Sequence, residues 1–506
     1  MDTSSAILPG IEHVVVVMFE NRSFDNMLGG LYPEKTQQGT FNGVKPGMNN
    51  NEDPYGPPIA LVEVWQAPTN TDAMIMPYPD PGELFEDMNQ QIFAPNKPPV
   101  TGPGEPTMGG FVYNYMHQEV QIDGPAPRGA DIMQYYKPGI AGNLPVMTAL
   151  AQAYGVSDAY HASGPVQTLV NRIFAHSGQP STYTNDKGQL VNCIDNSTVT
   201  RGQTDPLGTV DVPTVFNLLD DKFGANSINW KIYYNDLPLS TLITYVYNNW
   251  HWIESGGNVY HYDNNFASDV ANDTLPPYSF IEPRYTNMAD DTICQQGASY
   301  QPTSYHPGGA CPQWDPNADD KPPAVSVCFG EQYLADIYNT LASNPDVFKK
   351  TLLIVTFDEH GGLYDHAHPP GAKPPINNVA NFDYSRYGVR VPAIFINPYI
   401  KPGSIFRAQG PYPYDHTSII STLCKQFGLA GPLTNRDGVA PAFEGIINST
   451  TPSPKINLQP HTCQVPPKSE RGVQLANGTD PNSVYSVILN GMKQAWLKKQ
   501  EALAKK

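Results

Sequence analysis

Residues 14–30, VVVVMFENRSFDNMLGG, decide the fold, because six apolar residues end abruptly at Glu20 and Asn21. Four consecutive valines are typical of a strand that is buried on both faces of a sheet. A buried strand has no structural need for a carboxylate and an amide at its tip. A second stretch, more than 300 residues downstream, ends in a similar way with Asp358 and Glu359.

Short apolar runs predict three buried strands, which we expect to be parallel: His13–Phe19, Thr351–Phe357 and Val389–Ile396. Each run is rich in β-branched residues and is bounded by polar, Gly or Pro residues. Apolar residues spaced by three and four predict helices at 143–153, 331–342 and 416–427. Because strands alternate with helices, we predict an α/β fold with a mainly parallel central sheet and helices on both faces.

The chain of 506 residues is long enough for one large α/β unit with insertions. Long stretches rich in Pro, Gly and Asn interrupt the regular pattern, and loops of this length usually carry function or wrap the surface. We expect a catalytic unit over residues 1–450, with insertions at about 33–130 and 178–325 that form a smaller cap. Residues 451–506 then form a C-terminal extension whose last helix packs on the body.

The net charge of −18 argues against nucleic acid as a partner, because a phosphate backbone requires clustered Lys and Arg. No apolar run approaches the roughly 20 residues that a transmembrane segment needs. The first ten residues lack the basic start and apolar core of a signal peptide. We therefore expect a cytoplasmic chain or a mature exported one, and the low content of charged residues favours a secreted or periplasmic protein.

Six cysteines are spread widely with no CxxC pair, which argues against a zinc finger. Cys294 and Cys311 flank a loop rich in Gly and Pro and are a candidate disulfide. The alternative is that all six thiols are free.

The acidic strand ends predict a metal site. Ligands of open parallel sheets bind outside the carboxyl ends of the strands. If the two strands are neighbours, Glu20, Asn21, Asp358 and Glu359 converge at one edge, where carboxylates repel one another strongly. A divalent cation relieves this repulsion, and ligation by oxygen atoms favours Mg²⁺, Ca²⁺ or Mn²⁺ over Zn²⁺. The alternative is a pair of helix N-caps at two strand-to-helix turns.

A third stretch, residues 162–180, predicts a Gly-Pro turn that leads into a helix with Thr168 in its first turn. The backbone N–H groups and the positive end of the helix dipole stabilise a bound phosphate at such a place. Arg172 adds a cation one turn later. Taken alone, a threonine in a first turn is usually only a cap.

These stretches together resemble the phosphoesterase family, which contains the non-specific phospholipases C and related acid phosphatases of the alkaline phosphatase superfamily. ENRSFDNMLG, residues 20–29, is similar to the most specific motif of that family. TLVNRIFAHS, residues 168–177, resembles a T-x-P-N-R segment, with Val170 in place of the proline. TFDEHGGLYDHAHPP, residues 356–370, resembles T-[FY]-D-E-x-G-G-x-Y-D-H. Further matches keep the family order over about residues 11–445.

The resemblance implies an alkaline-phosphatase-like fold and a metal-dependent hydrolase of phosphomonoesters or phosphodiesters, either small molecules or lipids. It implies that Glu20, Asn21, Asp358 and Glu359 bind one catalytic divalent ion. It also implies that Thr168 is the nucleophile and a further ligand of that ion. The ion and the helix N-terminus stabilise the alkoxide of Thr168, so the reaction passes through a phospho-threonine intermediate.

One histidine of the matched motifs is a further candidate catalytic residue. His366, in YDHAH, is placed to contact the phosphoryl group or to protonate the leaving group. The alternative is a structural histidine that forms hydrogen bonds within its loop.

Two histidines expected from the resemblance are replaced. Glu83 stands where relatives carry the His of DPxH, and Lys321 stands where they carry the His of DDHP. We hypothesise that Glu83 and Lys321 form an ion pair across the pocket and alter specificity, because Lys keeps its proton where His titrates. The alternatives are a crippled site, or His161 or His306 in place of a missing histidine.

Two other functions are compatible with the same residues. The first is hydrolysis of sulfate or phosphonate esters, since a lysine at the oxyanion suits a less charged group. The second is a binding or surface protein of low activity that keeps the scaffold. Small soluble esters are favoured over lipids, because no helix has the aromatic and basic character of an interfacial anchor.

Overall fold

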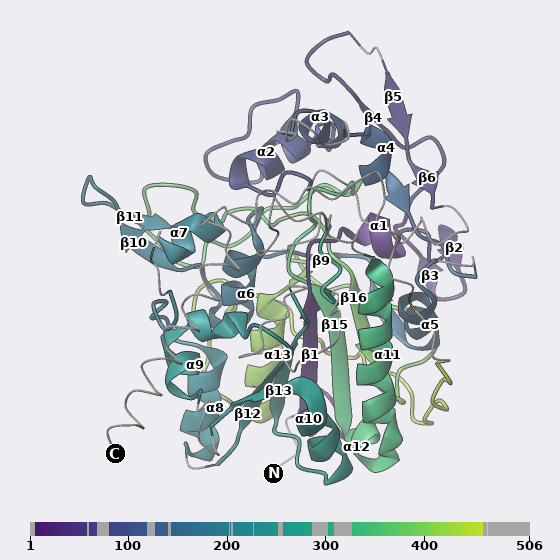
Figure 1. Ribbon diagram of the computed structural model, residues 1–506, viewed down its shortest axis with the longest axis vertical. Coiled ribbons are helices and arrows are strands. Elements are labelled where there is room, and N and C mark those ends of the chain that lie inside the picture. The colour runs from purple at the N-terminus through teal and green to yellow at the C-terminus, as the bar shows by residue number, and fades with distance from the viewer. Residues whose placement is uncertain are drawn as a thin grey trace, which may run out of the picture.

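The computed structural model describes residues 6–57, 60–67, 80–118, 127–139, 143–201, 203, 206–225, 227–250, 257–285, 302–307, 326–458 and 463. An eight-stranded sheet forms its centre, in the order β13-β12-β14-β1-β15-β16-β8-β17 (Figure 1). The bounds in that order are Val259–His261, Trp230–Tyr234, Tyr278–Glu282, His13–Phe19, Thr351–Phe357, Ala393–Ile396, Gly155–Ser157 and Ser404–Ile405.

The sheet is mainly parallel. Strand β1 pairs in parallel with β14 on one side and with β15 on the other. The predicted strands β1 and β15 have the bounds expected from the sequence, but the third prediction was wrong in direction and length. Strand β16 covers only Ala393–Ile396 and runs antiparallel to both β15 and β8. An apolar run specifies burial and not direction, which the connections decide.

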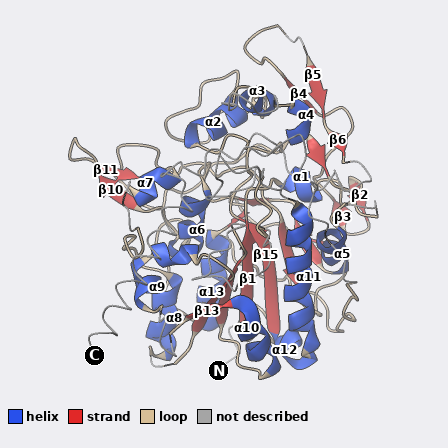
Figure 2. Ribbon diagram, viewed as in Figure 1, coloured by secondary structure: helices blue, strands red, loops and turns tan. Residues whose placement is uncertain are grey.

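Helices cover both faces of the sheet, which confirms the predicted α/β architecture (Figure 2). Helix α11 (Val327–Ser343) lies on one face and contacts the neighbouring helices α5 (Pro145–Ala153), α10 (Tyr262–Ala271) and α12 (Pro345–Lys350). Helix α6 (Thr168–Ser177) lies on the other face and contacts α8 (Val215–Phe223) and α13 (Thr417–Phe427). The predicted helices 143–153, 331–342 and 416–427 correspond to α5, α11 and α13, of which α11 begins earlier.

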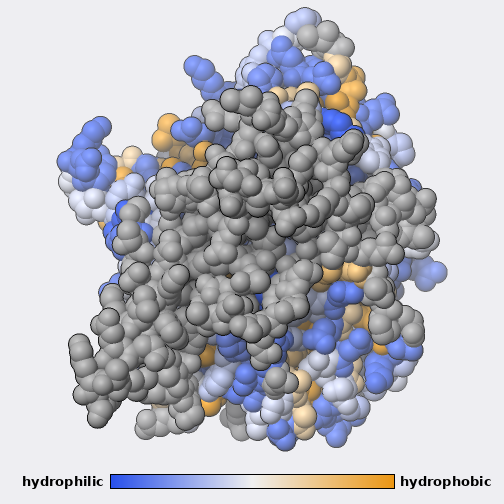
Figure 3. Space-filling model, viewed as in Figure 1, coloured by the Kyte–Doolittle hydropathy of each residue, from blue (hydrophilic) through white to orange (hydrophobic). Residues whose placement is uncertain are grey.

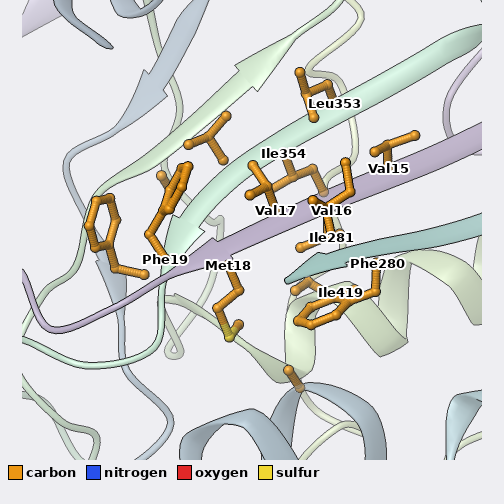
Figure 4. Packing of buried hydrophobic residues seen from close by; sticks show 14 of the residues in the cluster. Val15, Val16, Val17, Met18, Phe19, Phe280, Ile281, Leu353, Ile354 and Ile419 are labelled. Atoms are coloured by element: carbon orange, nitrogen blue, oxygen red, sulfur yellow. The ribbon is translucent and has the colours of Figure 1, made fainter. Parts of the chain in front are cut away.

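Alternating side chains of β1 fill the core on both faces. Phe19 points toward the α11 face, where its ring centroid lies 6.4 Å from that of Tyr333. Met18 points the other way, to the side on which Ile419 of α13 lies (Figure 4). All seven residues of β1 and of β15 are buried. Because both faces are covered, only the ends of these strands are free to present polar groups.

A second layer lies beyond the carboxyl ends of β1 and β15. It contains α2 (Phe85–Phe93), α3 (Phe111–Met116), α4 (Gly129–Ile132), β4 (Asn49–Asn51) and β5 (Leu61–Glu63), at the top of Figure 1. A separate small apolar cluster holds the layer together, and Leu363 and Tyr364 from the loop after β15 belong to this cluster. The layer falls largely in the insertion at 33–130, whose role as a cap remains a prediction.

The remaining short elements surround these two layers. Their bounds are α1 Phe24–Leu28, β2 Lys35–Thr36, β3 Gly39–Thr40, β6 Trp65–Gln66, β7 Gln134–Tyr135, β9 Tyr160–His161, β10 Thr182–Thr184, β11 Leu190–Asn192, α7 Asn196–Thr200, η3 Leu239–Leu242, α9 Thr244–Asn248 and β18 Tyr414–Asp415. The predicted terminal helix, from about residue 481, lies outside the described residues.

A disulfide joins Cys328, at the start of α11, to Cys463 in the C-terminal extension. The expected alternative of six free thiols was therefore wrong. Cys294 and Cys311, the predicted pair, lie outside the described residues. Cys193 and Cys424 are free.

Among the described residues, no helix is both long enough and apolar enough to cross a bilayer. In the space-filling view, the described residues at the lower end of the visible face are mostly hydrophilic, with small separate hydrophobic areas (Figure 3). Single exposed apolar residues of this kind are normal for a folded protein.

Replacing Ile354 in the centre of β15 by alanine should reduce the free energy of unfolding by about 2–5 kcal/mol, because it opens a cavity in a fully buried strand. Ile228→Ala is the matched control. Its side chain is exposed, so the change should stay within about 0.5 kcal/mol. Urea unfolding measures both, and equal effects would contradict the described core.

Candidate active site at the carboxyl ends of β1 and β15

The acidic ends of β1 and β15 meet, as the sequence predicts. The two strands pair over their whole length, up to Phe19 opposite Phe357, so the next residues of each leave the sheet side by side. The backbone N–H of Asn21 donates to Oδ1 of Asp358 at 3.1 Å. Glu20, Asp358 and Glu359 are all fully buried.

The turn after β1 has an unusual backbone that the loop after β15 holds in place. Asn21 has a φ of +57°, the left-handed region that Asn tolerates better than most residues. Gly361 packs directly against it, and a Cβ atom at that glycine would lie 2.1 Å from the carbonyl oxygen of Asn21. Gly361 itself has a φ of +61°, which favours glycine. The two loops therefore fix the position of the Asn21 side chain together.

Thr168 lies at the same edge of the sheet, at the start of α6. Its hydroxyl donates to Oδ1 of Asn21 at 3.2 Å, and the side chain is buried. As the first residue of a ten-residue helix, Thr168 stands at the positive end of the helix dipole. The predicted turn and helix are thus present, and the hydroxyl is close to the acidic strand ends.

Arg172, one turn further along α6, connects the helix to both strand ends. Its Nε atom donates to Oδ2 of Asp358 at 3.1 Å. A second nitrogen donates to the carbonyl oxygens of Met18 and Phe19 at 3.0 and 3.1 Å. These contacts orient Asp358 and place α6 against β1, which is a positioning role.

Glu83, from the stretch before α2, also reaches this place. The side-chain amide of Asn21 donates to its Oε1 atom at 2.6 Å. Nε2 of His306 lies 3.8 Å from the same oxygen. Lys321 lies outside the described residues, so its ion pair with Glu83 stays a prediction. Among the described residues, the histidine that lies beside Glu83 is His306, one of the two that the sequence offers in place of a missing family histidine.

A sequence signal for His306 was present. His306 is followed by Pro307, so the His-Pro pair that the resemblance leads one to expect occurs upstream of Lys321 and Pro322. Spacing and the flanking residues ADD and PP favoured the later position, Lys321. Residues 307–320 separate His306 from Lys321, and residues 308–325 lie outside the described residues.

Burial and mutual repulsion shift the titration of these carboxyl groups. Burial, with the charge of Asp80 as the next cause, raises the pKa of Glu83 to about 8, against the opposing effects of His306 and of the hydrogen bond from Asn21. Burial likewise raises the pKa of Glu359 well above its usual range, with the charge of Glu83 as the next cause. Burial also raises the pKa of Asp358, against the effect of Arg172. The group is short of positive charge.

The residues present fit a hard divalent cation. Oε1 of Glu359 is buried, and within the described part of the chain it has no hydrogen-bond partner. Such an oxygen is costly to bury unless a cation or a donor compensates it. The oxygens of Asn21, Asp358 and Thr168 lie at this edge through two hydrogen bonds and are the donor atoms that Mg²⁺, Ca²⁺ or Mn²⁺ prefer. Glu20, Asp358 and Glu359 are not among the described groups whose ligand atoms all lie within 4.8 Å of one another.

A second acidic cluster surrounds His366 and does not fit a metal. Nδ1 of His366 lies 2.6 Å from Oδ2 of Asp25, and Nε2 lies 3.0 Å from Oδ1 of Asn42. Arg390 donates to Asp25 at 3.0 Å and to Asp365 at 2.9 Å, so a guanidinium already supplies the positive charge. This arrangement favours the structural role of His366 over a catalytic one.

His161 is also held by the fold. Its Nδ1 atom lies 2.9 Å from the carbonyl oxygen of Gly388, and the side chain is buried. Burial lowers the pKa of His161 to about 3, so the ring is neutral. Of the two alternative histidines, the structure brings His306 to Glu83, whereas His161 hydrogen-bonds to the strand-like segment around Gly388.

Comparison with known proteins gives a consistent result. The model of the Phosphoesterase family matches residues 11–430. Non-specific phospholipase C6 of Arabidopsis thaliana is 30% identical over 454 residues, which cover 87% of this chain and 73% of the relative. Hemolytic phospholipase C of Pseudomonas aeruginosa is 25% identical over 461 residues, which cover 85% of this chain and 54% of the relative.

Solved structures give a weaker likeness. A protein in the alkaline phosphatase superfamily from Vibrio parahaemolyticus aligns at a TM-score of 0.30 with 15% identity, over 60% of this chain and 65% of the other. The assignment of an α/β fold therefore rests on the strand order and on the helices that cover the sheet.

An alanine in the left-handed region costs about 1–2 kcal/mol. Gly361→Ala should reduce the free energy of unfolding by more than this, because the new Cβ atom also meets the backbone of Asn21. Gly445→Ala is the matched control, since Gly445 has a φ of +74° with no atom within 4 Å of the new Cβ. Thermal and urea unfolding compare the two. Equal losses would show that the two loops do not pack as described.

Proposed function

We propose that this chain, which belongs to the Phosphoesterase family and is a hydrolase of phosphoric esters, uses Thr168 as its nucleophile. Glu20, Asn21, Asp358 and Glu359 then hold one divalent cation, with the Thr168 hydroxyl as a further ligand. The observation that carries the proposal is the hydrogen bond from the Thr168 hydroxyl to Asn21, beside buried carboxylates at the ends of β1 and β15.

The chemistry follows from these positions. The Thr168 oxygen attacks phosphorus, the ester alcohol leaves, and the resulting phospho-threonine is hydrolysed by water. A bound cation stabilises the threonine alkoxide and the charge on the phosphoryl oxygens. The N-terminus of α6 presents its dipole to the same oxygens. Arg172 keeps Asp358 oriented throughout and need not touch the substrate.

For the substrate, we propose a phosphodiester of the kind that a phospholipase C cleaves. The names of the relatives support this choice, because the plant and the bacterial proteins are phospholipases C. The retained Thr168, Asn21 and Asp358 support phosphoryl chemistry over the alternative of a binding protein that lacks activity. Among the described residues, no feature specifically favours hydrolysis of sulfate or phosphonate esters.

We also propose that the protein works in an oxidising compartment, as a secreted or periplasmic protein would. The support is the disulfide between Cys328 and Cys463, since such bonds persist mainly in oxidising surroundings.

Thr168→Ala should reduce kcat/KM for p-nitrophenyl phosphorylcholine by about 1,000-fold or more, because it removes the attacking oxygen. Thr168→Ser should retain activity to within about tenfold, since it keeps the hydroxyl. The control is Thr184→Ala, an exposed threonine at the end of β10, which should have no effect. Activity that survives in Thr168→Ala, with unchanged folding by circular dichroism, would refute this nucleophile.

Removal of divalent metal by EDTA should abolish hydrolysis, and Mg²⁺, Ca²⁺ or Mn²⁺ should restore it, because the alkoxide and the phosphate otherwise face uncompensated carboxylates. Release of the p-nitrophenol chromophore measures both steps. Asp358→Asn is expected to raise the metal concentration that restores half of the activity by about 10-fold or more. Full activity in the stripped protein would rule out the metal-dependent route.

A further inference from the structure

Thr168, the proposed nucleophile, is the first residue of its helix. Helix ends fray, because their first N–H groups have no partner within the helix. Within the described chain, the preceding residue, Gln167, does not cap α6 with its side chain. A hydroxyl that attacks phosphorus has to be held to within about 0.5 Å of its productive position. A group outside the helix must therefore fix the start of α6.

Asn196, at the start of α7, contacts α6 on both sides of Thr168. Its Oδ1 atom accepts from the backbone N–H of Leu169 at 2.9 Å. Its own backbone N–H donates to Oε1 of Gln167 at 3.0 Å. Figure 1 shows α7 beside the first turn of α6. One asparagine thus holds the residue before Thr168 and the residue after it.

The neighbouring residue, Asp195, holds a segment of the second layer. Its Oδ1 atom accepts from the backbone N–H of Phe85, the first residue of α2, at 2.9 Å. Phe85 follows Glu83 by two residues, and Glu83 accepts from the Asn21 amide. Two adjacent residues therefore fix the start of α6 and the start of α2 together.

These contacts close a ring around the candidate active site. The Thr168 hydroxyl donates to Asn21, and the Asn21 amide donates to Glu83. The chain continues from Glu83 into α2, which Asp195 holds, and Asn196 returns to α6. Each segment of the ring is held at two places, which restricts how far Thr168 can move relative to Asn21.

The pair of residues that closes the ring is itself held in one conformation. The hydroxyl oxygen of Thr198 accepts from the backbone N–H groups of Ile194 and Asp195, at 3.0 Å each. The same hydroxyl donates to the carbonyl oxygen of Asp195 at 2.6 Å. Asp195 and Asn196 are half-buried, so water competes only in part for their contacts. A support whose own geometry is fixed can fix the residues that it contacts.

We propose that Asn196 and Asp195 are positioning residues of the hydrolytic site, which hold the Thr168 hydroxyl against Asn21. The proposal rests on the proposed function, because it assigns their effect to the attacking oxygen. In this role neither residue touches the substrate. Asn196 acts on the residues that flank Thr168, whereas Asp195 acts through the segment that carries Glu83. Their loss should lower kcat and leave KM nearly unchanged, since only the chemical step depends on the position of the attacking oxygen.

The test is hydrolysis of p-nitrophenyl phosphorylcholine by variants of the full-length chain. Asn196→Ala should lower kcat by about 10–100-fold and change KM by less than about threefold. Asn196→Asp keeps an oxygen that accepts from Leu169, so its kcat should lie within about threefold of the unmodified value. Asp195→Ala should lower kcat by a smaller factor, because its effect passes through Glu83 and Asn21.

Asn344→Ala is the matched control. Asn344 is also half-buried, and its Oδ1 atom accepts from the backbone N–H groups of Asp346 and Val347 at the start of α12. This helix leads into the amino end of β15, away from the candidate active site (Figure 1). The control should lower the unfolding temperature by about as much as Asn196→Ala does, because both remove a helix cap, but it should leave kcat unchanged.

A double variant separates positioning from general damage. In Thr168→Ala the attacking oxygen is absent, so adding Asn196→Ala should not lower the residual activity further. A further loss as large as in the unmodified chain would overturn the proposal. An unchanged kcat in Asn196→Ala, or a loss of kcat that Asn344→Ala shares, would overturn it as well. An unchanged kcat in Asp195→Ala would overturn the ring.

These failures leave Thr168 as the nucleophile, so they are distinct from a failure of the proposed function. Activity that survives in Thr168→Ala alone would refute the proposed function, and with it the role of Asn196.

Discussion

The pairing of β1 with β15 is the constraint on which the rest of the structure depends. Their common register carries two carboxylate-bearing tips to one edge of a sheet whose faces are covered by helices. The strand bodies gain free energy by burial, but the same burial removes water from the acids that follow them. The hydrogen bond from Asn21 to Asp358 and the guanidinium of Arg172 compensate only part of this cost.

The loops after β1 and β15 are arranged around these incompletely compensated carboxylates. Gly361 approaches the backbone of Asn21, and Asn21 adopts a left-handed conformation that turns its amide toward Thr168 and Glu83. In contrast, Arg390 forms ion pairs with both aspartates of the neighbouring cluster, which consists of Asp25, Asp365 and His366. The two acidic clusters at one edge of the sheet differ in how a buried guanidinium is used: Arg390 contacts both Asp25 and Asp365, whereas Arg172 forms its ion pair with Asp358. The cluster around Asp25 therefore suits a structural role, and the cluster at the ends of β1 and β15 suits a catalytic one.

The sequence was sufficient where a short local pattern determines the outcome. The runs VVVVMF and TLLIVTF predicted both central strands, and the turn before Thr168 predicted the start of α6. It was insufficient where the outcome depends on distant segments. The direction of β16 depends on its connection, and the Cys328–Cys463 bond joins residues 135 positions apart. His306 precedes Lys321, the position that the flanking residues favoured. Spacing along the chain carries no information about such long-range contacts.

The central position of β1 also bears on how the chain is made. Its partners are residues 278–281 of β14 and 351–357 of β15, so no neighbour exists until most of the polypeptide has left the ribosome. Until then a valine-rich segment remains exposed, and segments of this type associate readily with other chains. The order of the strands along the chain therefore makes the β1 segment the part of the central sheet that waits longest for its partners during synthesis.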